Sequence, residues 1–353
     1  MKFYLKAATA LCAIAMAAGT AHAQAPGYDT PKTTWGAPDL QGFWNNTSIT
    51  SLQRPGGVDK LVLNQAEADR MVSRNMLVVL SKADDATNGD DPNNTKLLED
   101  RNADRGYNAF WIDPGTKVAM VKGELRSSWI VEPATGRIPY KPDAARGGGY
   151  AITNFDGPET RPIAERCVLS FSGSYGPVMM NSMYNNTFQF VQTPDAVMIL
   201  VEMNHDVRNI PIVANAAAAK HGTVPKWGGD SVGWYEGNTL VVQTTNVHPG
   251  QRAMITADGK LTERFTRWDN NQITYEFEVN DPALYSQPWK GEMALNIAEP
   301  LYEYACHEGN HAMAGILAGA RQIESEGKVP GMGPGIAAGL VLPRDDQGGE
   351  GSH

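Results

Sequence analysis

The sequence has few cysteines and lacks the common signatures of cofactor binding. Three cysteines occur among 353 residues, and no Cys-x-x-Cys pair is present, which disfavours cysteine-based metal binding and covalent haem attachment. The chain also lacks a Walker phosphate-binding loop, a strand-linked Gly-x-Gly-x-x-Gly and the Gly-x-Ser-x-Gly of many hydrolases. We therefore expect a protein that uses no cofactor.

Clusters of basic residues and long apolar runs are also missing. The formal net charge is −9, whereas proteins that bind nucleic acid need a basic face, so no nucleic acid partner is expected. Beyond the N-terminus no apolar run reaches the roughly 20 residues of a transmembrane helix, so no membrane span is expected. The apolar content of 42% still provides for a sizeable core.

The N-terminus has the pattern of a secretory signal. Lys2 and Lys6 precede a small apolar run over residues 7–18, which is followed by the small-residue site Ala21-His-Ala23. A transmembrane anchor is the alternative, but about 12 apolar residues are too few to span a bilayer. Residues 1–23 are predicted to be a cleaved signal peptide, and the mature protein is expected to be periplasmic or secreted.

Export would leave the mature protein with two cysteines, because Cys12 would be removed with the signal peptide. The remaining two, Cys167 and Cys306, would most often pair in an oxidising compartment. A metal thiolate or a nucleophilic cysteine is the alternative for either residue.

Three parts are expected after the signal peptide. Residues 24–38 would form an extended lead, residues 39–327 a single domain, and residues 328–353 a flexible tail rich in Gly and Pro. Within the domain, a capping box at Asn64 and Glu67 predicts a helix to about Ser81, and residues 312–326 predict a second helix.

Short apolar segments separated by tight turns dominate the domain. Strands are predicted over residues 39–44, 128–132, 188–192, 197–204, 233–235, 240–245, 261–268, 273–279, 289–297 and 301–305. Because almost no helices intervene, the sheet should be antiparallel, and eight or more twisted strands tend to close and remove exposed edges. The fold class predicted is mainly β, an antiparallel β-barrel with a few peripheral helices.

The segment from Glu202 to Arg208 is the densest group of ionisable residues in an otherwise apolar strand. An imidazole at His205 could act as general base or acid, with Glu202 as its carboxylate partner and Arg208 holding an anionic or phenolic oxygen. In a regular strand Glu202 and His205 point to opposite faces, so they share a pocket only if the strand bulges or ends between them. The alternative is an ion-paired rim in which Glu202 or Asp206 meets Arg208.

Asp230 is a second candidate partner for the histidine, because it lies in a glycine-rich loop where a ligand can approach the backbone. The alternative is an aspartate that caps local backbone donors. The remaining residues expected to bind substrate are polar or aromatic: Tyr184, Asn186, Trp234, His307 and Glu308.

The sequence His307-Glu-Gly-Asn-His311 matches the H-E-x-x-H motif of zinc enzymes. The motif requires both histidines one turn apart on a helix, but Gly309 and Asn310 weaken a helix, and no third ligand of the metzincin type follows. We therefore predict no metal site, and a metal-dependent hydrolase remains the alternative.

Taken together, nine segments resemble a large family of exported proteins from proteobacteria and acidobacteria. They cover residues 38–44, 132–139, 165–167, 184–186, 192–195, 202–208, 229–231, 234–242 and 302–310. The resemblance implies a lipocalin-like β fold, a disulfide between Cys167 and Cys306, and a link to the breakdown of plant-derived and other aromatic compounds by cofactor-independent lyases. An aromatic residue commonly stands at the position of His311 in that family, which makes the zinc motif look accidental.

These observations predict a cofactor-independent acid/base enzyme of the lyase or hydratase type, acting on a hydrophobic, aromatic small molecule in the barrel mouth. The alternative is a non-catalytic lipocalin-like carrier that uses the same cavity. The sequence makes no prediction of oligomeric state.

Overall fold

The computed structural model describes residues 24–75, 78, 115–144, 154–170, 174–251, 254–308 and 310–330. The predicted signal peptide lies outside the described residues, as does the predicted tail from residue 331 onward.

A ten-stranded sheet forms most of the domain. Nine strands follow one another in the order β8-β7-β6-β1-β13-β12-β11-β10-β9, and every neighbouring pair is antiparallel. Their bounds are β1 (Gly42–Asn45), β6 (Thr187–Gln192), β7 (Ala196–Val201), β8 (Val207–Pro211), β9 (Asp230–Glu236), β10 (Thr239–Thr245), β11 (Lys260–Arg267), β12 (Gln272–Asn280) and β13 (Trp289–Ile297). The tenth strand, β5 (Ile130–Glu132), pairs with β13.

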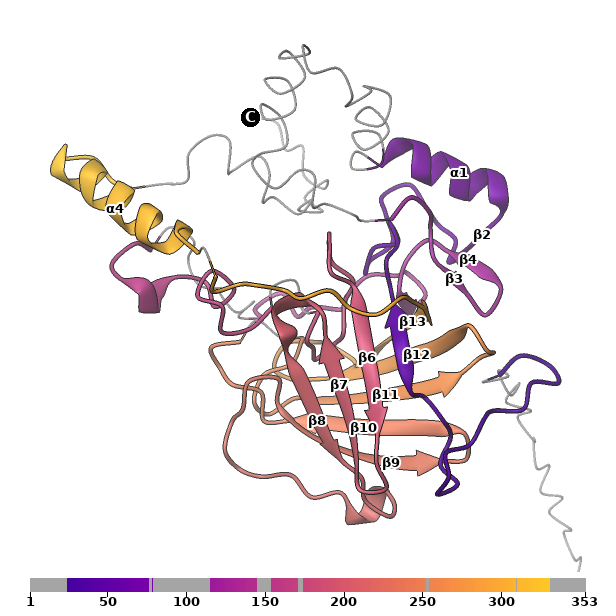
Figure 1. The fold of residues 1–353 in the computed structure, drawn as a ribbon. Helices are drawn as coiled ribbons and strands as arrows, with labels where there is room; N and C mark the ends of the chain where they lie inside the picture. Colours follow the sequence, from indigo (N-terminus) through magenta and orange to yellow (C-terminus); the bar gives the residue numbers. More distant parts are fainter. Residues whose placement is uncertain are drawn as a thin grey trace, which may run out of the picture.

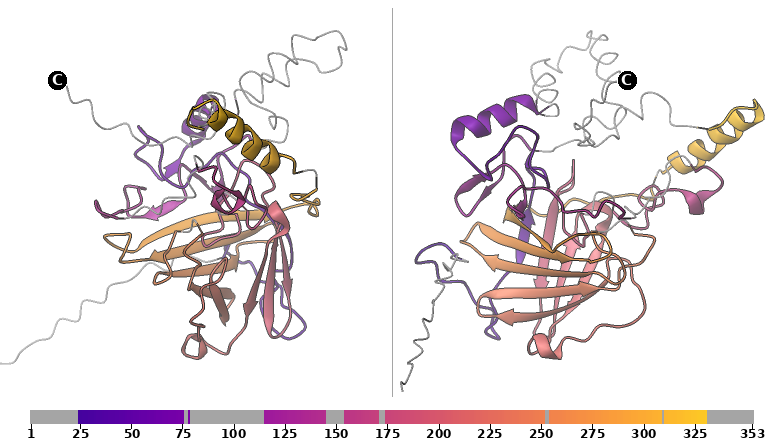
Figure 2. Two further views of the ribbon diagram at one scale, coloured as in Figure 1. Left: turned by 90° about the vertical axis from the view of Figure 1, so that its left-hand side faces the viewer. Right: turned by 180° about the vertical axis from the view of Figure 1, so that it is seen from behind.

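The sheet curls until its two edges meet (Figures 1 and 2). A parallel bridge joins Ile212, just after β8, to Gly233 of β9, and the Val213 N–H donates to the Gly233 carbonyl at 2.8 Å. The result is a nearly closed antiparallel barrel of nine strands. The predicted mainly β class and barrel architecture are confirmed.

A small sheet and two helices lie at one end of the barrel (Figure 1). The sheet has the order β2-β4-β3, from β2 (Val62–Leu63), β4 (Glu124–Arg126) and β3 (Met120–Val121). The capping box is confirmed at the start of α1 (Gln65–Arg74), where the Asn64 side chain accepts from the Glu67 N–H and the Glu67 carboxylate accepts from the Asn64 N–H, both at 2.9 Å. The second predicted helix is α4 (Ala312–Ser325).

Apolar side chains fill the inside of the barrel. Alternation along β11 points Leu261 and Phe265 inward, and both are fully buried. Phe265 stacks on Tyr275 with ring centroids 4.8 Å apart, and Phe277 meets Trp289 edge to face at 5.7 Å. Aromatic rings therefore occupy this part of the interior, where a carrier would keep space for a ligand.

The predicted strand over residues 301–305 does not form. Its neighbour β13 is already paired with β12 on one side and with β1 on the other, so β13 has no free edge there. Tyr302 is 81% exposed, and the segment crosses the end of the barrel without joining a ladder. The prediction was wrong because Tyr302 and Tyr304 alternate with polar residues, which is the pattern of a strand, although β13 has no free edge to pair with them.

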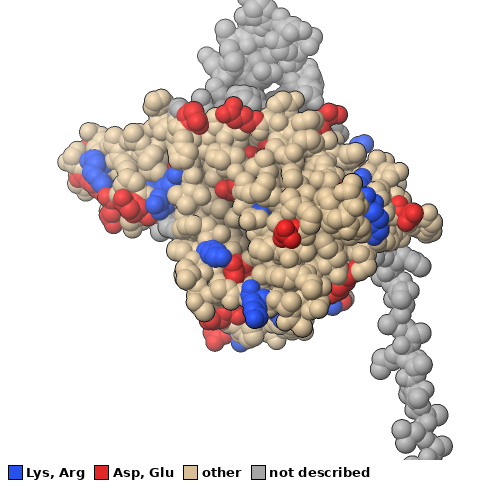
Figure 3. All heavy atoms as spheres, turned by 60° about the horizontal axis from the view of Figure 1, so that its bottom comes forward, with Lys and Arg blue, Asp and Glu red and all other residues tan. Residues whose placement is uncertain are grey.

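Two further observations concern the surface. Among the described residues, no helix has both the length and the apolar character required to cross a membrane. Acidic and basic side chains are interspersed on the face shown in Figure 3, where neither sign gathers into a large patch.

Candidate functional site

The turn after β7 brings Glu202 and His205 to one groove. The strand ends at Val201, and a 3-10 turn, η3 (Met203–His205), follows it with Asn204 at φ +61° and His205 at φ +46°. Because the chain leaves the strand between Glu202 and His205, the alternation of faces no longer separates them. This is the condition under which the sequence predicted a shared site.

The groove has a volume of about 460 Å³. The end of β7 and the η3 turn form one side, and the segment that follows β13 forms the other. We call that segment, residues 298–308, the strap. The lining residues are Leu200, Val201, Glu202, His205, Leu301, Tyr302, Glu303, Tyr304 and Glu308. A second groove of about 450 Å³ lies beside it and shares Glu202 and Tyr302.

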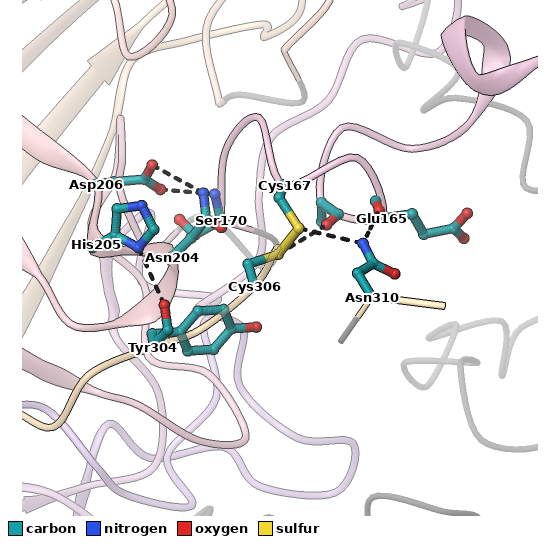
Figure 4. The surroundings of a disulfide bond; sticks show 10 residues. Glu165, Cys167, Ser170, Asn204, His205, Asp206, Tyr304, Cys306 and Asn310 are labelled. Carbon is teal, nitrogen blue, oxygen red and sulfur yellow. Dashed lines mark hydrogen bonds between the residues drawn. A yellow bond between two sulfur atoms is a disulfide. The ribbon is translucent and has the colours of Figure 1, made fainter. Parts of the chain in front are cut away.

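The imidazole of His205 is exposed and has a defined partner (Figure 4). Its Nδ1 lies 3.2 Å from the backbone carbonyl oxygen of Tyr304. A carbonyl only accepts hydrogen bonds, so neutral His205 carries its proton on Nδ1 and keeps the lone pair on Nε2. Nε2 is thus the basic nitrogen in this arrangement.

Asp206 supports the turn that carries His205. Its carboxylate accepts hydrogen bonds from the Ser170 N–H at 2.7 Å and from the Asn204 side-chain amide at 3.2 Å (Figure 4). Burial raises the pKa of Asp206 above its ordinary value, and these hydrogen bonds and the nearby His205 offset only part of that effect. Asp206 therefore anchors loop 161–170 to the turn.

Glu202 is placed at the groove, but its carboxylate is engaged by backbone. One oxygen accepts from the Thr187 N–H at 3.1 Å, and the other accepts from the Tyr302 N–H at 3.3 Å. The residue is 7% exposed. Its contacts are those of an anchor between β6 and the strap, rather than those of a partner to the His205 imidazole.

Two tyrosines have protonated hydroxyls. Tyr304 lines the groove, whereas the predicted site residue Tyr184 is not among the residues that line either groove. Burial raises the pKa of Tyr304, with a further contribution from Asp206, and burial likewise raises the pKa of Tyr184. Both phenols therefore stay neutral near pH 7 and can donate hydrogen bonds. Tyr302 and Tyr304 were not among the predicted site residues, although both stand in the segment that carries the family resemblance.

The structure places Arg208 inside the barrel and away from the groove. It is 3% exposed and donates to both carboxylate oxygens of Glu263, at 2.9 and 2.5 Å. The Tyr275 hydroxyl also donates to Glu263, at 2.7 Å. Burial alone would lower the pKa of Arg208, but the Glu263 carboxylate more than offsets this and raises it. Arg208 thus pairs with Glu263, and neither Glu202 nor Asp206 is its partner.

Asp230 is the first residue of β9, and the loop before this strand holds its side chain. Its carboxylate pairs with Lys226 and accepts from the Gly222 N–H at 2.6 Å, and His221 Nδ1 lies 3.7 Å away. Burial raises the pKa of Asp230, but the contacts with Lys226, Gly222 and His221 outweigh it and hold the pKa below its ordinary value. These contacts match the alternative of an aspartate that caps local backbone.

Asn186 and Trp234 also have structural partners. The Asn186 side chain accepts from the Ser182 N–H at 2.6 Å and donates to the Ser182 carbonyl at 3.0 Å, which closes the turn before β6. Trp234 pairs with Val241, whose neighbours Leu240 and Val242 belong to the inner core. Trp234 therefore points to the outer face of the barrel, where its indole N–H donates to Glu236 at 2.8 Å.

The two histidines of the H-E-x-x-H sequence do not share a helix. His307 and Glu308 are exposed at the end of the strap, and His311 is the N-cap of α4. Within the described parts of the chain, no group of three or more His, Cys, Asp or Glu side chains gathers in a way that could hold a metal ion.

The disulfide between Cys167 and Cys306 is present, with the two Cα atoms 5.8 Å apart. It joins loop 161–170 to the strap, and Asn310 donates to the Glu165 carbonyl at 3.2 Å beside it (Figure 4). The pairing implied by the family resemblance is confirmed.

No protein-family model matches the chain, and no curated protein or solved structure is significantly similar to it. The case for function therefore depends on the geometry of the groove.

Proposed function

We propose that this protein is a cofactor-independent acid/base enzyme of the lyase or hydratase type that acts on an aromatic small molecule in the groove between η3 and the strap. The observation that carries the proposal is the hydrogen bond between His205 Nδ1 and the Tyr304 carbonyl. It leaves Nε2 of an exposed imidazole as a base whose orientation is fixed.

In the proposed reaction, His205 Nε2 removes a proton from the substrate and returns it to the product or leaving group. The imidazolium formed in between keeps its Nδ1–H on the Tyr304 carbonyl, and the side chains of Glu202 and Glu308 line the same groove. The neutral hydroxyl of Tyr304 is available as a hydrogen-bond donor to a substrate oxygen. General acid–base catalysis of this kind contributes about 10²- to 10⁴-fold to a rate.

The substrate class follows from the lining. Leu200, Tyr302 and Tyr304 offer an apolar and aromatic surface. Acidic residues line the same groove: Glu202, Glu303 and Glu308. An aromatic ring with hydroxyl substituents fits both features, since the ring can stack on tyrosine and its hydroxyls can donate to carboxylates. The disulfide fits an oxidising compartment, in keeping with the proposed export to the periplasm or beyond. A lipocalin-like relationship remains part of the proposal.

Removal of the proposed base is the direct test. The oxidised protein and its His205→Gln variant would be incubated with a library of phenolic dimers, and products would be sought by mass spectrometry as loss or gain of water, formaldehyde or carbon dioxide. Turnover by the native protein should fall at least 100-fold in the variant, while ligand binding persists. His311→Gln is the matched control, because His311 is exposed and lies outside the groove lining.

A non-catalytic carrier is the second candidate, favoured by one observation. Glu202 uses both carboxylate oxygens on backbone N–H groups, so His205 has no carboxylate hydrogen-bonded to it among the described contacts. A carrier would bind the same phenolic ligands unchanged, and His205→Gln would then have the same affinity and no chemical phenotype.

A further inference from the structure

Few hydrogen bonds attach the strap to the barrel, and Tyr304 also packs against the apolar core. The Ala298 N–H donates to the Phe43 carbonyl at 3.0 Å, and the Tyr302 N–H donates to Glu202 at 3.3 Å. The Tyr304 carbonyl accepts from His205 Nδ1 at 3.2 Å. Because residues 301–305 join no strand, no ladder of hydrogen bonds adds to these contacts.

The same segment forms the wall of both grooves. Leu301, Tyr302, Glu303, Tyr304 and Glu308 line the first, and residues 298–300 with Tyr302 line the second. The groove, and the carbonyl that orients His205, therefore exist only while the strap lies across the end of β7.

A closed circuit of contacts fixes the far end of the strap (Figure 4). The turn holds loop 161–170 through the hydrogen bond from the Ser170 N–H to Asp206, 2.7 Å long. That loop holds the strap through the Cys167–Cys306 disulfide. The strap then returns to the turn through Tyr304, two residues before Cys306, and its bond to His205.

The disulfide is the covalent link of this circuit. The net contribution of one hydrogen bond to stability is no larger than the conformational entropy cost of ordering one residue of backbone. The three hydrogen bonds above are too few to order the 11 residues of the strap, even together with the packing of Tyr304 against the core. The cross-link supplies what they lack, because it removes most of the freedom that the released strap would gain.

We infer that the Cys167–Cys306 disulfide is a redox-sensitive latch of the groove, so that its reduction by a dithiol frees the strap and releases His205 from the Tyr304 carbonyl. The regulation applies to the site of the proposed function. Cys306 is the more accessible of the two cysteines, since it is only partly buried whereas Cys167 is 8% exposed. A thiolate of the dithiol attacks the Sγ atom of Cys306 and forms a mixed disulfide, and Cys167 leaves as a thiolate. The second thiol of the dithiol then displaces Cys306, so that two protein thiols and one oxidised dithiol result.

Hydrogen–deuterium exchange tests the latch without any substrate. The native oxidised protein, the same protein reduced with dithiothreitol, and the Cys167→Ser/Cys306→Ser variant would be compared by mass spectrometry. The Tyr302 amide, followed in overlapping peptides over residues 299–306, should exchange at least tenfold faster in the last two samples because its bond to Glu202 is lost. Peptides over 273–279 of β12 should stay protected. The ¹⁵N shifts of His205 should change from a fixed Nδ1–H tautomer to a mixture of tautomers.

Two outcomes would overturn the latch. Equal exchange of residues 299–306 in the oxidised and reduced protein would mean that the strap holds without the disulfide. Faster exchange throughout β12 as well would mean that the disulfide stabilises the whole fold. The dithiothreitol sample covers the case in which the double variant does not fold. If the strap is released as expected but neither form has turnover, the proposed function fails and the latch stands.

Discussion

The buried pair of Arg208 and Glu263 makes a quantitative prediction about stability. Glu263 is 0% exposed and its carboxylate has two donors, Arg208 and the Tyr275 hydroxyl. The Arg208→Met variant removes the only cation of this network and leaves a buried carboxylate with one neutral donor. Breaking a buried ion pair in this way costs about 3–5 kcal/mol. The Glu263→Met variant should lose a similar amount, because it leaves a buried guanidinium without its carboxylate.

Replacement of both partners separates the cost of an unpaired buried charge from the value of the pair itself. The Arg208→Met/Glu263→Met variant leaves neither charge buried, so it should be more stable than either single variant, since apolar replacement of a whole buried pair is often neutral or stabilising. A double-mutant cycle from urea denaturation of the oxidised proteins measures this coupling. Arg264→Met is the matched control, because the pair of Arg264 with Glu236 is 42% and 46% exposed and is worth at most about 1 kcal/mol.

Two results would refute this reasoning. One is a loss below about 1 kcal/mol for Arg208→Met, which would mean that the buried charge is tolerated. The other is an unchanged free energy of unfolding together with a loss of ligand binding, which would return Arg208 to the substrate role suggested by the sequence.

Two further predictions concern a close contact and a titrating group. A Cβ at Gly291 would lie 2.0 Å from the Phe277 ring, so Gly291→Ala should destabilise by at least about 1–3 kcal/mol in urea denaturation. Gly315→Ala in α4, where a Cβ meets open space, should instead be neutral or stabilise by up to about 1 kcal/mol; similar losses for both would contradict the packing argument. The folded-state pKa of Asp230 lies below its unfolded value, so its stabilisation is present above the unfolded pKa of about 3.9 and is lost as pH falls through the folded pKa. Asp230→Asn should therefore be less stable than the native protein at pH 7, the difference should shrink towards pH 3, and turnover should persist; loss of turnover without loss of stability would restore Asp230 to the site.

The barrel was predictable because its signals are local. The run from Trp289 to Ile297 forms a strand with the predicted bounds, and the turns around Asn238 and Asn270 separate strands as expected. The strand expected over residues 301–305 depended on a different kind of information, namely which edges of β13 are already occupied. A sequence pattern reports the faces of a strand but not the number of free edges in its sheet.

The sequence does contain a signal for the burial of Arg208. In a strand, residues two apart lie on the same face. Arg208 therefore shares a face with Ile210, and Glu263 shares a face with Leu261 and Phe265, so each strand has one charged residue on its apolar face. Two such charges of opposite sign are expected to pair inside the barrel, because an isolated buried charge is prohibitively costly. Only the pairing of distant strands was beyond the reach of that argument, since β8 and β11 are separated in the sheet by five others.

The filled interior of the barrel also limits where an enzyme or a carrier could bind its ligand. Phe265, Tyr275 and the Arg208–Glu263 pair occupy the inside of the barrel, so a ligand there would have to displace aromatic rings or break a buried ion pair. Enzyme and carrier must both use the outer groove that the strap completes. A carrier needs the wall of that groove but not the basic nitrogen of His205, whereas an enzyme needs both. Reduction of the disulfide should therefore abolish binding in either case, and only replacement of His205 separates the two.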